Sequence, residues 1–79
     1  MKQETWAKIE EYLREAVCHL SGDLGEFEEY LAHNELGLAW EVLLKIADSQ
    51  GLVTAEFWRP MAKAAGLMVE NSYFTPNLD

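Results

Sequence analysis

The chain has 79 residues, of which 49% are hydrophobic and 25% charged, a balance typical of one small globular domain rather than of a disordered segment. Fourteen Asp and Glu against six Lys and Arg give a net charge of −8, and a surface this acidic repels nucleic-acid backbones and anionic membranes. No apolar run approaches the ~20 residues of a membrane span, no signal-peptide pattern follows Met1, and the single Cys18 allows no internal disulfide. We therefore expect a cytoplasmic protein that binds neither nucleic acid nor membrane.

Apolar residues recur at steps of three and four along four segments, a pattern that predicts an all-α protein with a single small four-helix domain. The first helix is expected over about residues 4–20 and the second over about 23–33. Ser21 and Gly22 lie between them, where they favour a helix end. The faces expected to be buried comprise Trp6, Ile9, Leu13, Ala16, Val17 and Leu20 in the first helix and Leu24, Phe27 and Leu31 in the second.

The third helix, expected over about 35–50, is the most apolar, and its wide apolar arc is typical of a central helix with several neighbours. Asn34 is expected to cap its start and Gly51 to end it. The main buried stripe comprises Leu36, Ala39, Trp40, Leu43, Ile46 and Ala47, and it is widened by Val42 and Leu44.

The fourth helix is expected over about 54–68, with Thr54 as its N-cap residue. Its buried face comprises Phe57, Met61, Ala64, Ala65 and Met68. The apolar periodicity ends there, so residues 69–79 are expected to form a short irregular C-terminal tail.

Pro60 leaves two alternatives for the start of this helix. A helix that begins at Ala55 has the proline in its second turn, where it costs a hydrogen bond or introduces a kink. A tight turn over residues 55–58 would instead place the start of the helix near Arg59.

Charge is unevenly distributed along the chain. Between Glu15 and Leu44 there are seven acids and no Lys or Arg, and five of the seven lie between Asp23 and Glu35. Like charges on adjacent turns destabilise a helix by roughly a few tenths of a kcal/mol per pair, so a role other than stability is indicated. One interpretation is a solvated face that keeps a small protein in solution. The other is a surface complementary to a strongly basic partner, such as the cleft of a nuclease.

The residues that we expect to bind a partner lie on one side of the second helix or at its two ends. Helical spacing places Glu26, Glu29 and His33 opposite the apolar face, with Tyr30 at its edge. Tyrosine is frequent among the residues that anchor interfaces, although an inert edge tyrosine is the alternative. The expected partner-binding residues are Asp23, Glu26, Glu29, Tyr30, His33 and Glu35.

The sequence holds no pattern that indicates catalysis, so we expect no enzyme activity, no metal and no cofactor. Cys18 and His19 are adjacent and point about 100° apart on a helix, which prevents them from acting as nucleophile and base. Glu15 stands four residues before His19, and Glu29 four residues before His33. Because a metal site needs three or four converging ligands, we interpret both as solvent-facing ion pairs.

The segment from Glu26 to Leu43, EFEEYLAHNELGLAWEVL, resembles the signature of small bacterial immunity proteins of the Maf type. In these proteins a helix ends in a His/Asn-Glu-(aromatic or Leu)-Gly-Leu-Ala stretch and runs into the next helix. The Glu-Phe-Trp at 56–58 and the AKAAGLM at 62–68 also look like the last helix of that family, so the resemblance covers about residues 23–68. Trp40 departs from it, because a smaller or aliphatic residue is expected there.

The resemblance implies an immunity protein of a polymorphic toxin or contact-dependent inhibition system. Such a protein stays in the cytoplasm and binds the C-terminal toxin domain of its own system, often a nuclease. The resemblance supplies no catalytic residue, and we expect a monomer or a small homo-oligomer. The alternative function is that of a non-catalytic helical adaptor or regulator that binds a basic protein through the same acidic surface.

Overall fold

The computed structural model describes residues 3–51 and 54–71, and this part of the chain contains four α-helices and no β-strand. The helices are α1 (Gln3–Val17), α2 (Gly25–Ala32), α3 (Leu36–Ser49) and α4 (Ala55–Glu70). The prediction of an all-α, four-helix protein is therefore confirmed. None of these four helices has the length and apolar content that crossing a bilayer requires.

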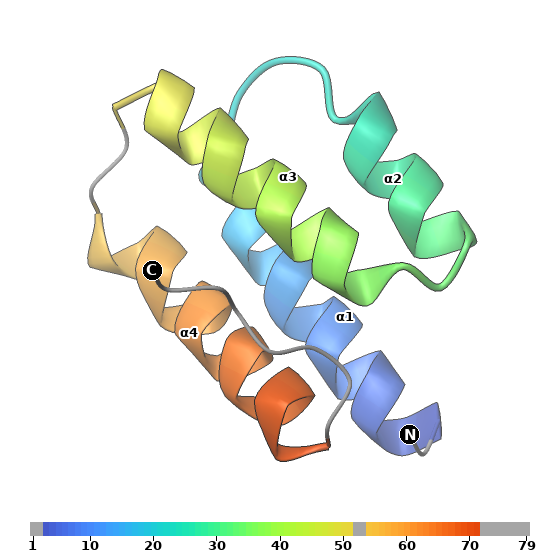
Figure 1. The fold of residues 1–79 in the computed structure, drawn as a ribbon. Coiled ribbons are helices and arrows are strands. Elements are labelled where there is room, and N and C mark those ends of the chain that lie inside the picture. The colour runs from blue at the N-terminus through green and yellow to red at the C-terminus, as the bar shows by residue number, and fades with distance from the viewer. Residues whose placement is uncertain (1–2, 52–53, 72–79) are drawn as a thin grey trace.

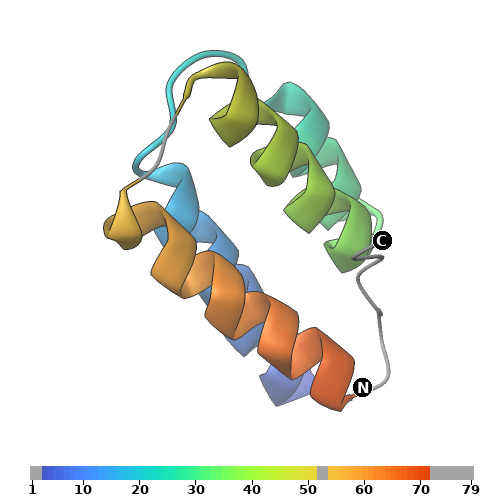
Figure 2. The ribbon, with the colours of Figure 1, turned by 60° about the vertical axis from the view of Figure 1, so that its left-hand side comes forward.

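The helices are arranged as two pairs. α1 packs along α4, and α2 packs along α3, so that the two pairs form two layers (Figure 2). α3 also contacts α1 and α4 and thereby joins the layers (Figure 1). This confirms the prediction that the third helix is central, and its wide apolar arc follows from having neighbours on several sides.

The core is formed by apolar side chains from all four helices, and no polar or charged residue of the described segments is buried. The buried hydrophobic side chains of the core are Ile9, Leu13, Ala16, Phe27, Leu31, Leu36, Ala39, Val42, Leu43, Ala47, Phe57, Met61, Ala64 and Met68. All of them belong to faces that the apolar periodicity predicts to be buried. The edges of these faces are partly buried and pack against the same cluster, among them Trp6, Val17, Leu20, Leu24, Leu44 and Ile46.

Trp40 lies at the edge of the core, although its place in the apolar stripe predicts an interior position. Its indole is half-buried, and Nε1–H donates a hydrogen bond to the carbonyl oxygen of Met61 at 2.9 Å. An indole N–H enclosed by apolar side chains loses its hydrogen bond to water, which is costly without a protein acceptor. The edge position therefore lets the ring pack while its donor links α3 to α4.

The first helix is shorter than predicted, because α1 ends at Val17 and not near Leu20. Over the next three residues, each backbone N–H donates to the carbonyl oxygen three positions earlier, at distances between 3.0 and 3.3 Å. This is the tighter pattern of a 3₁₀ turn. Leu20 still packs against the core, so the apolar periodicity continues for about one turn beyond the α-helix.

α3 ends at Ser49, close to its predicted boundary, and Gly51 is the stop that the sequence predicts. Gly51 has a φ of +64°, and its N–H donates to the carbonyl oxygen of Asp48 at 3.1 Å. A residue with a Cβ atom adopts this left-handed conformation at a cost, which is why glycine is favoured directly after a helix.

α4 is one continuous helix from Ala55 to Glu70, with Pro60 inside its second turn. The alternative in which the helix begins near Arg59 is therefore wrong. The proline ring is buried, and its missing N–H removes a single hydrogen bond near the helix start. Because α4 continues to Glu70, it includes the first two residues of the predicted tail, and residues 72–79 of that tail lie outside the described residues.

Thr54 occupies the N-cap position of α4, as predicted, with a φ of −78° and a ψ of 143°. Its carbonyl oxygen accepts hydrogen bonds from the backbone N–H groups of Phe57 and Trp58, at 3.2 and 3.3 Å. Its hydroxyl makes no capping hydrogen bond. The extended backbone at this position, rather than the side chain, therefore begins the helix.

Candidate partner-binding face on α2

Asp23 fixes the start of α2, which begins at Gly25 and not at Asp23 as predicted. Its Oδ1 accepts a hydrogen bond from the backbone N–H of Gly25 at 2.8 Å. This satisfies one of the N–H groups that have no partner within the first turn of a helix. Gly22 precedes it with a φ of +96°, a conformation that favours glycine. Asp23 therefore has a structural role, while its side chain stays exposed.

The turn from α2 into α3 is a Schellman motif with Asn34 in the left-handed position, at a φ of +59°. The N–H of Asn34 donates to the carbonyl oxygen of Leu31 at 3.1 Å. The N–H of Glu35 donates to the carbonyl oxygen of Tyr30 at 2.8 Å. α3 begins at Leu36, and its N-cap residue is Glu35, so the prediction that Asn34 caps this helix is wrong.

His33 folds its imidazole back onto the end of α2. Its Nδ1 lies 2.9 Å from the carbonyl oxygen of Glu29, which can only accept, so Nδ1 carries the proton. The predicted ion pair between the Glu29 carboxylate and His33 is therefore wrong, and the pair of Glu15 with His19 is likewise not formed between these described residues. Carbonyl groups in the last turn of a helix lack a backbone donor and can accept a hydrogen bond from a nearby side chain. An exposed ion pair contributes little free energy, because water screens it.

Glu26, Glu29 and His33 are exposed on the outer side of α2, opposite the buried Phe27 and Leu31. The carboxylates of Glu26 and Glu29 form no ion pair with any residue that the structure describes. Two adjacent turns of this short helix therefore present to solvent carboxylates that no described residue pairs.

The three other predicted residues flank this exposed side. Asp23 and Glu35 are exposed at the two ends of α2, and Tyr30 is half-buried at its edge, where it packs against the core. The structure therefore places four of the six predicted residues on α2 or directly at its C-terminus, and the other two just beyond its ends. Tyr30 is the least accessible of them, so it offers a partner less contact area than the sequence suggests.

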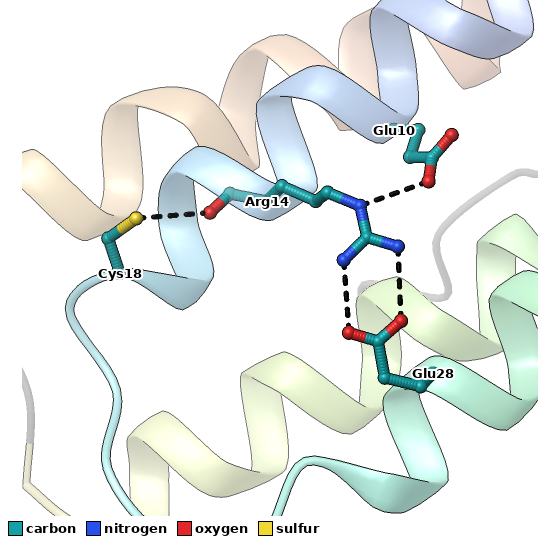
Figure 3. Close-up of polar contacts among 4 residues, drawn as sticks. All are labelled: Glu10, Arg14, Cys18 and Glu28. Carbon is teal, nitrogen blue, oxygen red and sulfur yellow. Dashed lines mark hydrogen bonds and ion pairs between the residues drawn. The ribbon is translucent and has the colours of Figure 1, made fainter.

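Arg14 reaches α2 from α1, a contact that no spacing in the sequence indicates. Its Nη1 and Nη2 donate to the two carboxylate oxygens of Glu28, each at 3.0 Å, and its Nε donates to Glu10 at 3.0 Å (Figure 3). The Glu28 carboxylate raises the pKa of the Arg14 guanidinium, and the guanidinium in turn lowers the pKa of the Glu28 carboxyl. The two side chains are 47% and 52% exposed, so water screens this link between the layers.

The fold therefore divides the acids of the second helix into two groups. Glu28 lies on the side of α2 that faces α1, where Arg14 neutralises it. Glu26 and Glu29 lie on the outer side, away from that contact. The acidic stretch has no Lys or Arg of its own, but one of its carboxylates is paired by a residue directly before it.

Charge also separates between the two layers. α2 and α3 together carry five acids and a single base, Lys45, and the adjoining Asp23 and Glu35 bring the acids of this layer to seven. α1 and α4 together carry six acids and four bases, so their charges cancel in part. The α2–α3 layer is therefore the stronger source of negative potential and attracts cationic surfaces.

Other chemical groups among the described residues are few. No cluster of three or more His, Cys, Asp or Glu side chains in these segments is arranged to hold a metal ion. Cys18 is exposed, and its Sγ lies 3.5 Å from the carbonyl oxygen of Arg14 (Figure 3). Hollows between α1 and α4 carry both signs of charge; one is lined by Glu15, His19, Glu56, Arg59, Pro60 and Lys63, another by Lys8, Tyr12, Lys63, Gly66, Leu67 and Glu70.

No protein-family model, no curated protein and no solved structure matches this chain. Exposed carboxylates attract the ammonium and guanidinium groups of Lys and Arg, and they repel phosphate. The charge of this face is thus complementary to that of a cationic surface.

Proposed function

We propose that this protein is an immunity protein: it binds the cognate toxin domain of a bacterial polymorphic toxin system through the exposed side of α2 and neutralises it. The observation that carries the proposal is the placement of Glu26 and Glu29, which are exposed and have no ion pair with a described residue. They belong to the layer with the least compensating positive charge. The resemblance of residues 26–43 to Maf-type immunity proteins is a second line of support.

The proposed mechanism is occupancy of a basic surface. A nuclease toxin needs a cationic cleft for its nucleic acid, and an acidic helix laid over that cleft competes with the phosphate backbone. Carboxylates at the rim of such an interface mainly accelerate association, because they steer the encounter of the two proteins. Charge pairs that lose their water on binding contribute more, and removing one partner of such a pair costs roughly 2–5 kcal/mol.

The test is a double charge reversal, Glu26→Lys with Glu29→Lys. The binding partner is the C-terminal domain encoded by the gene adjacent to the one for this chain. We expect the reversal to weaken binding and to reduce protection of cells that express the domain. The loss should be largest at low salt, where screening is weakest. Isothermal titration at two salt concentrations and a co-expression growth assay measure the two effects.

The matched control is the double reversal Glu4→Lys with Glu11→Lys. Both residues are exposed on α1, and the control changes the net charge by the same amount as the reversal on α2. If this control weakens binding more than the reversal on α2 does, the interface lies on α1 and the assignment to α2 is wrong. An adjacent gene without a toxin domain would instead favour the adaptor function.

A further inference from the structure

Leu38 is an exposed apolar side chain in the acidic layer. Two large hydrophobic residues of the described segments are exposed, Leu38 at 41% and Val69 at 46%. Leu38 lies in the first turn of α3, whereas Val69 lies near the end of α4 in the other layer. The acidic layer therefore exposes one large apolar side chain among its described residues.

Two exposed acidic residues flank Leu38 along α3. Glu35 precedes it by three residues and Glu41 follows it by three, a spacing that makes side chains neighbours on a helix surface, and both are exposed. Leu38 lies on α3, which packs along α2, the helix that carries most of the predicted partner-binding residues. Glu35 is itself one of the predicted partner-binding residues, so Leu38 lies next to one end of that set.

The core does not explain a leucine at this position. The buried stripe of α3 uses Leu36, Ala39 and Leu43, each 0% exposed, and Leu38 points away from that stripe. Leucine has nearly the same helix propensity as Lys or Glu, so local helix stability does not select it either. A leucine at position 38 differs from a Lys or Glu there in the apolar surface that it exposes to water. A partner that covers this surface gains from its burial.

We propose that Leu38 is the apolar anchor of the partner-binding face, and that this face extends from α2 onto the first turn of α3. The proposal rests on the proposed function and names the chemistry of its partner: a basic surface whose Lys or Arg side chains lie with their aliphatic stems on Leu38. The charged ends of those side chains then reach Glu35 and Glu41, because long basic side chains cover apolar surface while their heads stay polar. Interfaces derive most of their affinity from such a desolvated centre, and their charged rims contribute mainly to rate and orientation.

The test is Leu38→Glu, which adds negative charge to the face while it removes the apolar contact. A face that acts by charge alone would bind the basic domain encoded by the adjacent gene at least as tightly as before. An apolar anchor instead predicts that affinity falls about tenfold or more, mainly through faster dissociation. The neutral change Leu38→Gln should give a similar loss. Surface plasmon resonance separates the two rates, and circular dichroism checks that each variant is folded.

The matched control is Val69→Glu, which makes the same kind of change at a similarly exposed residue in the other layer, and we expect its Kd to stay within about twofold of wild type. If both Leu38 variants bind as tightly as wild type while the reversal of Glu26 and Glu29 weakens binding, Leu38 is not an apolar anchor. The proposed function would still stand in that case. A loss in Val69→Glu as large as in Leu38→Glu also overturns the anchor. Failure of the wild-type protein to bind the domain overturns the proposed function, and this inference with it.

Discussion

The two layers of this molecule bury similar apolar faces but expose different surfaces. On α1, basic and acidic side chains are interspersed, and Arg14 pairs with Glu10 at 3.0 Å while Lys8 lies 3.8 Å from Glu11. The α2–α3 layer has one base for seven acids. Both layers contribute fully buried side chains to the core, so packing does not explain the difference. The two layers differ in charge at solvent-facing positions. Substitutions at such positions change stability little, so selection for binding can act on them.

The comparison also shows how a short helix accommodates so much like charge. Both ends of α2 are held by local hydrogen bonds, from Asp23 at its start and from the Schellman turn at its end. Glu26 and Glu28 lie in the first turn, where the partial positive charge of the helix N-terminus favours acids. Glu29 lies beyond that turn, without this compensation. Its carboxylate is therefore the one whose position is hardest to explain by stability.

The largest expected effect is at the junction of the layers. Leu43 is fully buried on α3, the helix that contacts the other three. Leu43→Ala should destabilise the protein by about 2–5 kcal/mol, because a cavity remains where both layers meet. Urea unfolding followed by circular dichroism measures this loss. Leu38→Ala on the exposed side of the same helix is the control, and we expect it to cost less than about 1 kcal/mol. Similar losses at both positions would contradict a core centred on α3.

A smaller effect is expected at the ion pair that connects the layers. Arg14 lowers the pKa of the Glu28 carboxyl in the folded state, chiefly through their hydrogen bonds. The pair therefore stabilises the protein above the pKa that Glu28 has when unfolded, and this contribution is lost as pH falls through the lowered folded-state pKa. Because both side chains are about half exposed, solvent screening limits the coupling to about 0.2–1 kcal/mol.

A double-mutant cycle with Arg14→Gln and Glu28→Gln isolates this coupling. We expect a measurable coupling free energy between Arg14 and Glu28 at neutral pH. This coupling should vanish at a pH well below about 4, where an ordinary Glu is protonated. High salt should reduce it as well. A coupling that persists unchanged in acid would mean that neutral hydrogen bonds or packing, rather than charge, connect α1 to α2.

The sequence predicts the buried faces of all four helices because apolar periodicity is a local property of each segment. The role of Gly51 as a helix stop is predictable for the same reason, because a glycine directly after an apolar stripe is typical of a helix C-terminus. Leu38 also carries a signal in the sequence: it is an apolar residue in α3 that lies outside both the main stripe and the positions that widen it. A residue that breaks the stripe without being polar is a candidate for contact with another molecule.

What the sequence leaves open depends on alternatives with similar local energies or on contacts distant in the chain. Asn34 suits both the start of one helix and the left-handed end of another, and the backbone geometry decides between the two. His33 has both a carboxylate and a backbone carbonyl within reach four residues earlier. Arg14 and Glu28 meet only because the fold brings the Arg14 side chain within reach of α2, and no helical spacing connects the two residues.

The smallest expected effects are on α2 itself, where two single charge reversals should act in opposite directions. Glu29→Lys removes a negative charge that no described residue pairs and places a base three residues after Glu26, so we expect a gain of roughly a few tenths of a kcal/mol. Glu26→Lys places a positive charge in the first turn, against the helix dipole, so we expect a loss of similar size. The double reversal should therefore leave the melting temperature nearly unchanged while it weakens binding of the basic domain. Differential scanning calorimetry at low salt resolves the three variants. If the double reversal instead lowers stability as much as Leu43→Ala, the carboxylates of Glu26 and Glu29 support the fold, and their exposure on the acidic layer no longer indicates a partner.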